Sequence, residues 1–166
     1  GITNDAKSID SDLINIYLSD NQILFSFSSV ELISRTINGQ YPDYKQIIPA
    51  KYKTEVEINR SDFVRAIKEA AVFSKNGIYD ISLVFRKKIL NVYAASNQSG
   101  ESSVDVPCEF SGEENDISVN YRYLLDGLNV LEDDKVILKI INSNTPCQLV
   151  SNKDDRYNYI IMPIRS

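Results

Sequence analysis

Residues 54–71 read TEVEINRSDFVRAIKEAA, and this stretch carries the clearest structural signal in the chain. Polar and apolar side chains alternate up to Ile58, which is typical of a β-strand with one buried face. Asn59 stands where a helix N-cap is expected, and Asp62 places an acidic group in the first turn. The apolar residues that follow recur at helical spacing: Phe63, Val64, Ile67, Ala70 and Ala71. The stretch therefore predicts a strand that runs directly into an amphipathic helix, which we expect to end near Lys-Asn-Gly at 75–77.

The same pattern returns further along the chain. Asn120 stands 61 residues after Asn59 and again separates a strand-like segment from an amphipathic one. At this offset the apolar positions match without a gap: Ile58 with Val119, Phe63 with Leu124, Val64 with Leu125, Ile67 with Leu128, and Ala70 with Leu131. Three strand-like segments follow each helix, at residues 81–85, 89–96 and 102–110 and at residues 136–141, 147–151 and 157–164. Although chance could match a few apolar positions, we predict two β-α-β-β-β units over residues 52–166.

Two such units predict an α+β fold. Each helix has one apolar stripe, so both helices should pack on the same side of antiparallel strands. Three more antiparallel strands are predicted earlier in the chain, at residues 13–18, 22–27 and 30–37. The segment 38–50 contains an Asn-Gly pair and two prolines and is the natural linker, so we divide the chain into domains 1–50 and 51–166. The polar residues 1–12 predict a fragment boundary followed by a flexible lead-in.

The composition excludes several classes of site. The 166 residues are 43% hydrophobic and 25% charged, which is typical of a soluble globular protein. The absence of histidine excludes catalysis with a histidine base and histidine-ligated metals. Cys108 and Cys147 have no CxxC partner, which favours a reducing, cytoplasmic compartment, and we expect both to be small buried hydrophobes. No signal peptide or membrane-spanning run is present. The net charge of -5 means that any contact with nucleic acid must be local.

No enzymatic motif emerges from the sequence. The acidic pairs at 113–114 and 133–134 fall in predicted turns, where carboxylates are usually only solvated. The motifs GxxxxGK[ST], GxGxxG and GxSxG, which bind phosphates or position a nucleophile, are absent. We therefore predict no cofactor, no metal site and no catalytic residue, and favour a binding or scaffolding protein over an enzyme. A hydrolase that uses aspartate and lysine is the least favoured alternative.

Apolar residues occur where the predicted fold does not need them. The linker contains Tyr41-Pro42-Asp43-Tyr44 and Ile47, although linkers are normally polar. The chain ends in an apolar segment, 159–164, that is hydrophobic on both faces. This segment is either a terminal strand buried on both sides or, together with the linker, a concave groove that binds peptides. Val72 and Phe73 lie off the helix stripe and either pack under the next loop or form a subunit contact.

Three motifs give the chain a family resemblance: YPDYKQIIP at 41–49, VNYRYLLDGLNVL at 119–131 and YIIMPIRS at 159–166. Together they resemble the bacterial sliding clamp, the beta subunit of DNA polymerase III, and the resemblance covers essentially the whole chain. It implies the DNA-clamp fold, with the closing strands of the middle domain at about residues 12–40 and the complete third domain at about 52–166. It also implies a non-catalytic subunit of a head-to-tail ring dimer that encircles duplex DNA and tethers the replicative polymerase.

The resemblance further implies three sets of site residues. A groove for linear motifs of the polymerase alpha subunit, the clamp loader and repair proteins would use Pro42, Ile47, Ile78, Asn120, Tyr123, Pro146, Ile160, Met162, Pro163, Ile164 and Arg165. Contacts to DNA phosphates in the central hole would come from Arg65, Lys68, Lys75 and Arg122. The dimer interface would use Val72 and Phe73.

The chain departs from the family pattern in several places. Gln46 replaces a commonly basic residue, Ser166 a commonly apolar one, and Ile78, Asn144 and Pro146 differ in type from familiar relatives. Because the first domain and most of the middle one are absent, we expect a half-formed groove and a monomeric or weakly associated chain. The residues alone also allow a stand-alone α+β module that binds peptides or proteins without a DNA role. Two further β-α-β-β-β copies upstream would distinguish a clamp from such a module.

Overall fold

The computed structural model describes residues 13–41, 43–49, 51–154 and 156–165. The predictions for residues 1–12, Pro42 and Ser166 lie outside this range. The chain forms two compact units, Gly1–Asp43 and Tyr44–Ser166, and each is described by itself. The domain boundary at residues 50 and 51 stays a prediction. Among the described residues, no helix combines the length and the apolar character needed to span a membrane.

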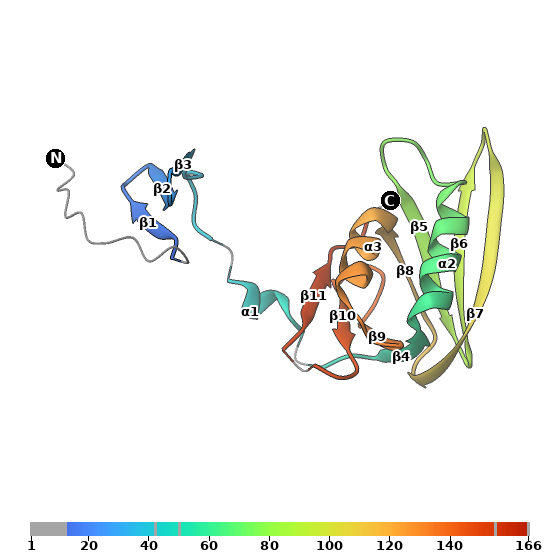
Figure 1. The fold of residues 1–166 in the computed structure, drawn as a ribbon. Helices are drawn as coiled ribbons and strands as arrows, with labels where there is room; N and C mark the ends of the chain where they lie inside the picture. Colours follow the sequence, from blue (N-terminus) through green and yellow to red (C-terminus); the bar gives the residue numbers. More distant parts are fainter. Residues whose placement is uncertain (1–12, 42, 50, 155, 166) are drawn as a thin grey trace. The chain divides into compact units, whose positions relative to one another are not determined.

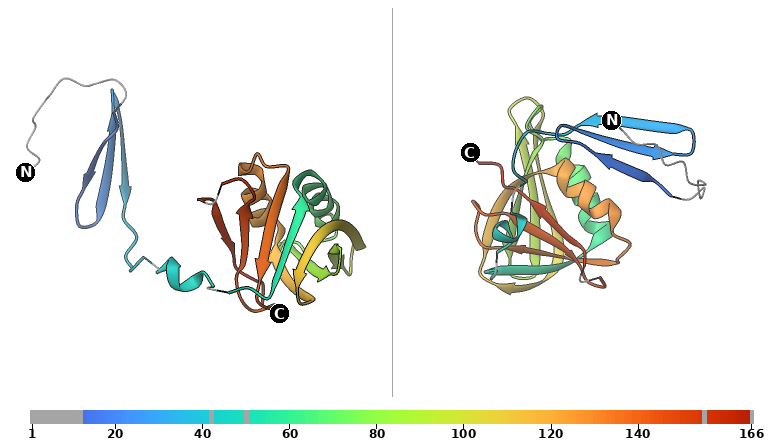
Figure 2. Two further views of the ribbon diagram at one scale, coloured as in Figure 1. Left: turned by 90° about the horizontal axis from the view of Figure 1, so that it is seen from below. Right: turned by 90° about the vertical axis from the view of Figure 1, so that its left-hand side faces the viewer.

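The first unit contains a three-stranded antiparallel sheet in the order β1-β2-β3. Its strands are β1 (Asn15–Leu18), β2 (Gln22–Phe27) and β3 (Val30–Arg35), which confirms the three predicted strands with shorter ends, and Figure 2 shows them side by side. Residues paired across an antiparallel ladder share a face. Phe25 pairs with Ile16 and Leu32, and with their alternate neighbours they form an apolar face. Ile23 and Phe25 are half-buried, and the other apolar residues of this face are exposed: Ile16, Leu18, Phe27, Val30 and Leu32.

The second unit opens with one helical turn, α1 (Tyr44–Ile47), where the sequence predicted only a loop. The backbone N–H of Ile48 donates to the carbonyl of Tyr44 and closes that turn. Two matching series of elements follow: β4 (Thr54–Asn59), α2 (Arg60–Ala71), β5 (Asp80–Arg86), β6 (Ile89–Ser96) and β7 (Gly100–Gly112), then β8 (Asn115–Asn120), α3 (Tyr121–Val130), β9 (Lys135–Ile140), β10 (Cys147–Ser151) and β11 (Asn158–Ile161). The predicted duplication is therefore confirmed.

Eight antiparallel strands of this unit form one continuous sheet in the order β11-β10-β9-β4-β7-β6-β5-β8. The long strand β7 joins its two halves, because residues up to Pro107 pair with β6 and residues from Cys108 onward pair with β4. Both helices lie on the same side of this curved sheet and touch each other (Figure 1). The α+β architecture predicted from the repeat is confirmed.

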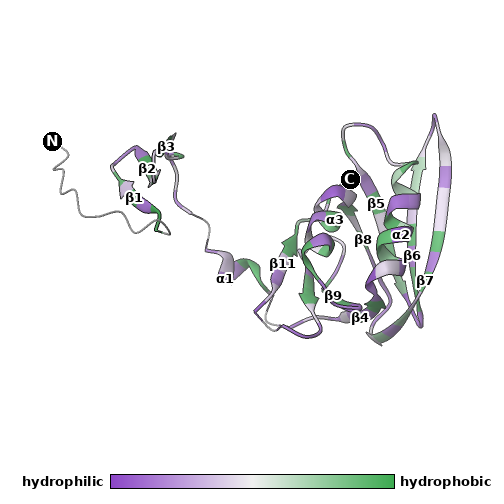
Figure 3. Ribbon diagram, in the orientation of Figure 1, coloured by the Kyte–Doolittle hydropathy of each residue, from purple (hydrophilic) through white to green (hydrophobic). Residues whose placement is uncertain are grey.

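The core lies between the helices and the sheet. Helix α2 buries Phe63 and Ile67, and α3 buries Leu124 and Leu128, all of them predicted stripe positions. Every second residue of β4, β5, β6, β8 and β9 faces this core, as the alternation of hydrophobic and hydrophilic residues in Figure 3 suggests. Cys147 is fully buried, and burial raises the pKa of its thiol to about 12. Cys108 is only partly buried, so the expectation that both cysteines are buried was half wrong.

Two predicted element ends were also wrong. Helix α2 ends at Ala71, several residues before Gly77, because tighter turns replace the helical bonds there: Phe73 N–H donates to the carbonyl of Ala70, and the Ser74 hydroxyl donates to that of Ala71 at 2.9 Å. The last strand ends at Ile161 and not at Ile164. Pro163 has no N–H to donate, and the chain beyond β11 leaves that ladder and crosses to β8.

Candidate functional site

The site forms around the carboxyl end of β8, which has a neighbour on each side. On one side, Asp80 pairs with Asn120 in the β5–β8 ladder, so the preceding Ile78 lies next to this end. On the other side, Pro163 forms a bridge with Val119, and Ile164 N–H donates to the carbonyl of Ser118 at 2.8 Å. The C-terminal tail and the α2–β5 loop therefore flank the same end of one strand.

The side chain of Asn120 links helix α3 to the α2–β5 loop. Its side-chain oxygen caps α3 by accepting from the backbone N–H of Arg122 at 2.9 Å, and its amide group donates to the carbonyl of Ile78 at 3.3 Å. The backbone N–H of Tyr121 also donates to the carbonyl of Tyr79 at 2.9 Å. Asn59, the matching cap of α2, instead accepts from Asp62 N–H and the Ser61 hydroxyl within its own helix turn. Of the two cap residues, Asn120 is the one whose side chain also anchors a neighbouring loop.

Large apolar side chains are exposed around this anchor. Ile78 is 48% exposed, Tyr123 is 59% exposed and Met162 is 58% exposed. Pro146 joins them from the β9–β10 loop, because the next residue, Cys147, pairs with Ile161 in the β10–β11 ladder. The remaining predicted tail residues are half-buried, at Ile160, Pro163 and Ile164, or exposed, at Arg165. Register and hydrogen bonds thus bring most of the predicted groove residues to one place. Ile47 lies on α1, and its part in a groove stays a prediction.

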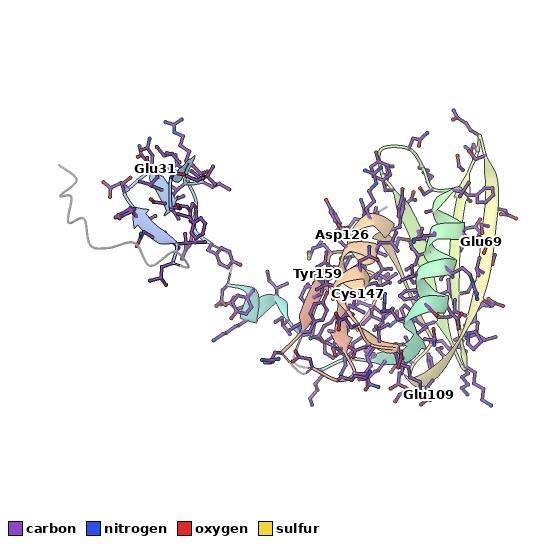
Figure 4. The ribbon with its side chains drawn as sticks, viewed as in Figure 1. Glu31, Glu69, Glu109, Asp126, Cys147 and Tyr159 are labelled. Carbon is purple, nitrogen blue, oxygen red and sulfur yellow. The ribbon has the colours of Figure 1, made fainter. Side chains whose placement is uncertain are left out.

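Sequence reasoning missed Tyr159, whose ring packs against α3 and lies near Tyr123. Its ring lies against α3 at Gly127, where an added Cβ would stand 2.6 Å from Cδ1 of Tyr159. Burial, with the nearby Asp126 carboxylate and Tyr123, raises the pKa of the Tyr159 phenol, and Figure 4 shows Tyr159 and Asp126 at this helix. The Tyr157 hydroxyl donates to the Gly127 carbonyl at 2.7 Å, and the two tyrosine rings stack 6.5 Å apart. The sequence feature that could have indicated this close contact is Gly127 itself, a glycine in the middle of an amphipathic helix.

The four predicted DNA-facing residues differ in how they are held. Arg65 is exposed on α2 and pairs with Asp62 at 3.0 Å, and Lys68 is exposed on the same helix. The ammonium of Lys75 lies 4.0 Å from the Asp80 carboxylate. The guanidinium carbon of Arg122 lies 3.5 Å from the centre of the Tyr79 ring, and hydrogen bonding to Tyr121 raises the pKa of Arg122. The structure therefore groups Arg65 with Lys68 and places Arg122 at the start of the other helix.

Comparison with known proteins decides the family. Residues 45–165 match the family model of the DNA polymerase III beta subunit, C-terminal domain. The chain belongs to this family. It is 30% identical over 160 residues to the beta sliding clamp of Staphylococcus epidermidis, covering 95% of the chain and 42% of that relative. It is 28% identical to the Bacillus subtilis beta sliding clamp over 99% of the chain and 45% of that relative.

Solved structures of sliding clamps have the same fold. The sliding clamp from Bartonella birtlesii bound to griselimycin superimposes with a TM-score of 0.82 and 27% identity, over 92% of this chain and 41% of that one. The Bacillus subtilis clamp superimposes with a TM-score of 0.78 and 27% identity, again over 92% of this chain and 41% of that one. The chain thus spans about two fifths of the length of these relatives and carries the DNA-clamp fold.

In this beta-subunit domain the two residues after α2 have different surroundings. Val72 caps the helix and is 70% exposed. Phe73 packs partly against the core, and its ring lies 3.7 Å from the position that a Cβ on Gly100 would take. Of these two residues, therefore, Phe73 contributes to core packing and Val72 exposes its apolar side chain. Within the described ranges, no cluster of three cysteine, aspartate or glutamate side chains is arranged to hold a metal ion in this clamp domain.

Proposed function

We propose that this chain is the C-terminal part of a processivity clamp that encircles duplex DNA and tethers the replicative DNA polymerase. The observation that carries the proposal is the family match over residues 45–165, combined with an exposed apolar cluster at the end of β8. In this role the protein is a non-catalytic subunit and acts in the cytoplasm, where bacterial chromosomal DNA is replicated.

The apolar cluster is one wall of a groove for linear peptide motifs. Ile78, Tyr123 and Met162 expose apolar surface that the fold does not use, and such patches mark binding sites in soluble proteins. A methionine adapts its shape to different partners. We assign to the groove all the positions predicted above, from Pro42 in the linker to Arg165 in the tail. Its occupants would be motifs of the DNA polymerase III alpha subunit, the clamp loader and repair proteins.

We propose that residues 1–50 are the end of a middle domain with its linker and that residues 51–166 are the third domain. The apolar face of β1, β2 and β3 supports this division, because a large exposed apolar patch on a soluble protein marks a surface that another part of the structure or a partner covers. In a longer clamp the rest of the middle domain would cover it and would supply the other wall of the groove. We therefore expect weaker peptide binding by this chain than by a complete clamp.

Contacts to DNA would come from the exposed basic residues Arg65, Lys68, Lys75 and Arg122. Two of them already pair with neighbouring carboxylates, so their attraction to phosphate is modest and depends on salt. A ring holds DNA by enclosing it, and weak contacts let it slide. A head-to-tail dimer would bury Val72 and Phe73 against the first domain of a second copy. We expect residues 1–166 by themselves to be monomeric, which size-exclusion chromatography with light scattering tests.

Peptide titration tests the groove. A fluorescein-labelled peptide carrying a polymerase-type clamp-binding motif is titrated with the chain and with Met162→Ala, and anisotropy is recorded. We expect saturable binding that weakens about tenfold in the variant, because removing a buried apolar side chain costs an interface roughly 1–2 kcal/mol. Val130→Ala is the matched control, since Val130 is exposed on α3 away from the groove residues. The complete Bacillus subtilis clamp serves as positive control. Equal weakening by both substitutions, or no saturable binding at all, would contradict the assignment.

A further inference from the structure

The guanidinium of Arg122 is held beside the proposed groove. Arg122 is the second residue of α3, between the cap Asn120 and the exposed Tyr123. Its guanidinium carbon lies 3.5 Å from the centre of the Tyr79 ring. Tyr79 follows Ile78 directly, and the carbonyl oxygens of these two residues accept hydrogen bonds from Asn120 and from the backbone of Tyr121. The cation is therefore anchored to the loop that forms one flank of the groove.

The Tyr79 ring under Arg122 is itself packed against a second aromatic ring. The ring of Tyr121 meets that of Tyr79 edge to face, with centres 6.0 Å apart and planes at 87°. Tyr79 adopts a left-handed backbone conformation, with φ at +58°. A non-glycine residue keeps this conformation where surrounding contacts hold it, so the backbone that carries the ring is held in place. An arginine that is already stacked on a ring loses less side-chain freedom when it binds a ligand.

The charge of Arg122 has no acidic partner. Among residues 13–41, 43–49, 51–154 and 156–165, no carboxylate lies within ion-pair distance of its guanidinium, although Asp126 stands one turn further along the same helix. Arg65 and Lys75, by contrast, each face an aspartate. Stacking covers the face of the guanidinium, and besides the N–H that bonds to Tyr121 its edge carries further N–H groups that can donate to a carboxylate.

We propose that Arg122 is a specificity residue of the peptide groove and binds a carboxylate side chain of the incoming peptide. This inference rests on the proposed function, because it needs a peptide in the groove. It moves Arg122 from the DNA-facing set to the groove. The geometry favours this placement: the cation is fixed to the Ile78 flank of the β8 end, whereas Arg65 and Lys68 extend from the outer face of α2.

A peptide scan tests the inference. The labelled peptide used above is made in matched versions that carry Asp or Asn at one position at a time outside its apolar anchor residues. Each version is titrated with the chain, with Arg122→Gln and with the control Lys68→Gln. We expect one position at which Asp binds about three- to tenfold more tightly than Asn, which is the range for a partly exposed charge-assisted bond. That preference should vanish in Arg122→Gln and persist in Lys68→Gln. Arg122→Lys should keep only part of it, because lysine lacks the planar fork.

The outcomes distinguish a failure of the role proposed for Arg122 from a failure of the proposed groove. If the peptides bind and Arg122→Gln changes no Asp-to-Asn ratio, the inference is wrong while the groove stands. If no version binds the unmodified chain, the proposed groove fails and the inference fails with it. Titration with a labelled DNA duplex at low salt tests whether Arg122 instead belongs to the DNA-facing surface. A loss of DNA affinity in Arg122→Gln equal to that in Lys68→Gln, with the peptide ratios unchanged, would return Arg122 to the DNA-facing surface.

Discussion

Replacing Gly127 by alanine tests whether the close contact between α3 and β11 shapes the candidate groove. A Cβ at this position would lie 2.6 Å and 2.8 Å from two ring carbons of Tyr159, and 3.1 Å from a methyl carbon of Leu149. The new methyl group overlaps the Tyr159 ring and also presses on Leu149, so the ring must shift. Overpacking of this kind costs about 1–3 kcal/mol. Alanine returns about 1 kcal/mol through its higher helix propensity.

We therefore expect Gly127→Ala to lower the free energy of unfolding by up to about 2 kcal/mol and Tm by up to roughly 8 °C. Urea denaturation followed by circular dichroism measures the first quantity. The decisive comparison uses Tyr159→Ala, in which the obstructing ring is gone. In that background Gly127→Ala should become neutral or stabilising, by up to about 1 kcal/mol. Because Tyr159 precedes the groove residue Ile160, the single variant should also bind the labelled peptide more weakly. A Gly127→Ala that stabilises the chain equally in both backgrounds would refute the reasoning.

Two further predictions concern the core and the contact between the two units of the repeat. Arg60 donates from its side chain to the carbonyls of Asp133 at 3.2 Å and Leu128 at 3.3 Å, so Arg60→Ala should lower the free energy of unfolding by about 1–2 kcal/mol. The exposed Arg65→Ala should change it by less than about 0.5 kcal/mol, and a similar loss from both variants would contradict the role of Arg60. Burial raises the pKa of the Cys147 thiol from its ordinary value of 9.0 to about 12, so the stability that the neutral thiol contributes is complete below pH 9 and is lost as pH rises toward 12. Urea denaturation at pH 8 and pH 10 should show a larger decrease for the unmodified chain than for Cys147→Ala, and equal decreases would show that this thiol is not protected by burial.

The repeat could be predicted from sequence because both of its ingredients are local. An alternating strand, an asparagine cap and a helical apolar stripe each appear within a few residues, and Asn59 and Asn120 mark the same junction twice. The end of α2 could not be predicted this way. Basic residues and Gly77 suggested a late end, but the Ser74 hydroxyl binds the Ala71 carbonyl and ends the helix earlier.

Long-range contacts also limited the prediction of the site. The family resemblance placed Ile78, Asn120 and Met162 in one groove, but nothing local in the sequence shows that the Asn120 amide reaches the Ile78 carbonyl. The stacking of Arg122 on Tyr79 likewise joins residues 43 positions apart, and it changes the role we assign to this arginine. Tyr159 was missed because its importance depends on Gly127, which gives no sign in the sequence of which ring it accommodates.

The candidate groove arises where the two repeat units stop being equivalent. In the first repeat unit, β7 continues past β6 and pairs with β4 from Thr54 to Ile58, so this edge of β4 is covered. In the second repeat unit, the described part of the chain after β11 reaches β8 but forms only the bridge between Pro163 and Val119 and one further hydrogen bond. The proline cannot extend a ladder as the matching part of β7 does. Apolar side chains that a full ladder would order into a strand, Met162 among them, are left exposed beside the α3 cap. The proposed binding surface thus lies where the last strand of the second repeat unit, β11, is much shorter than its counterpart β7.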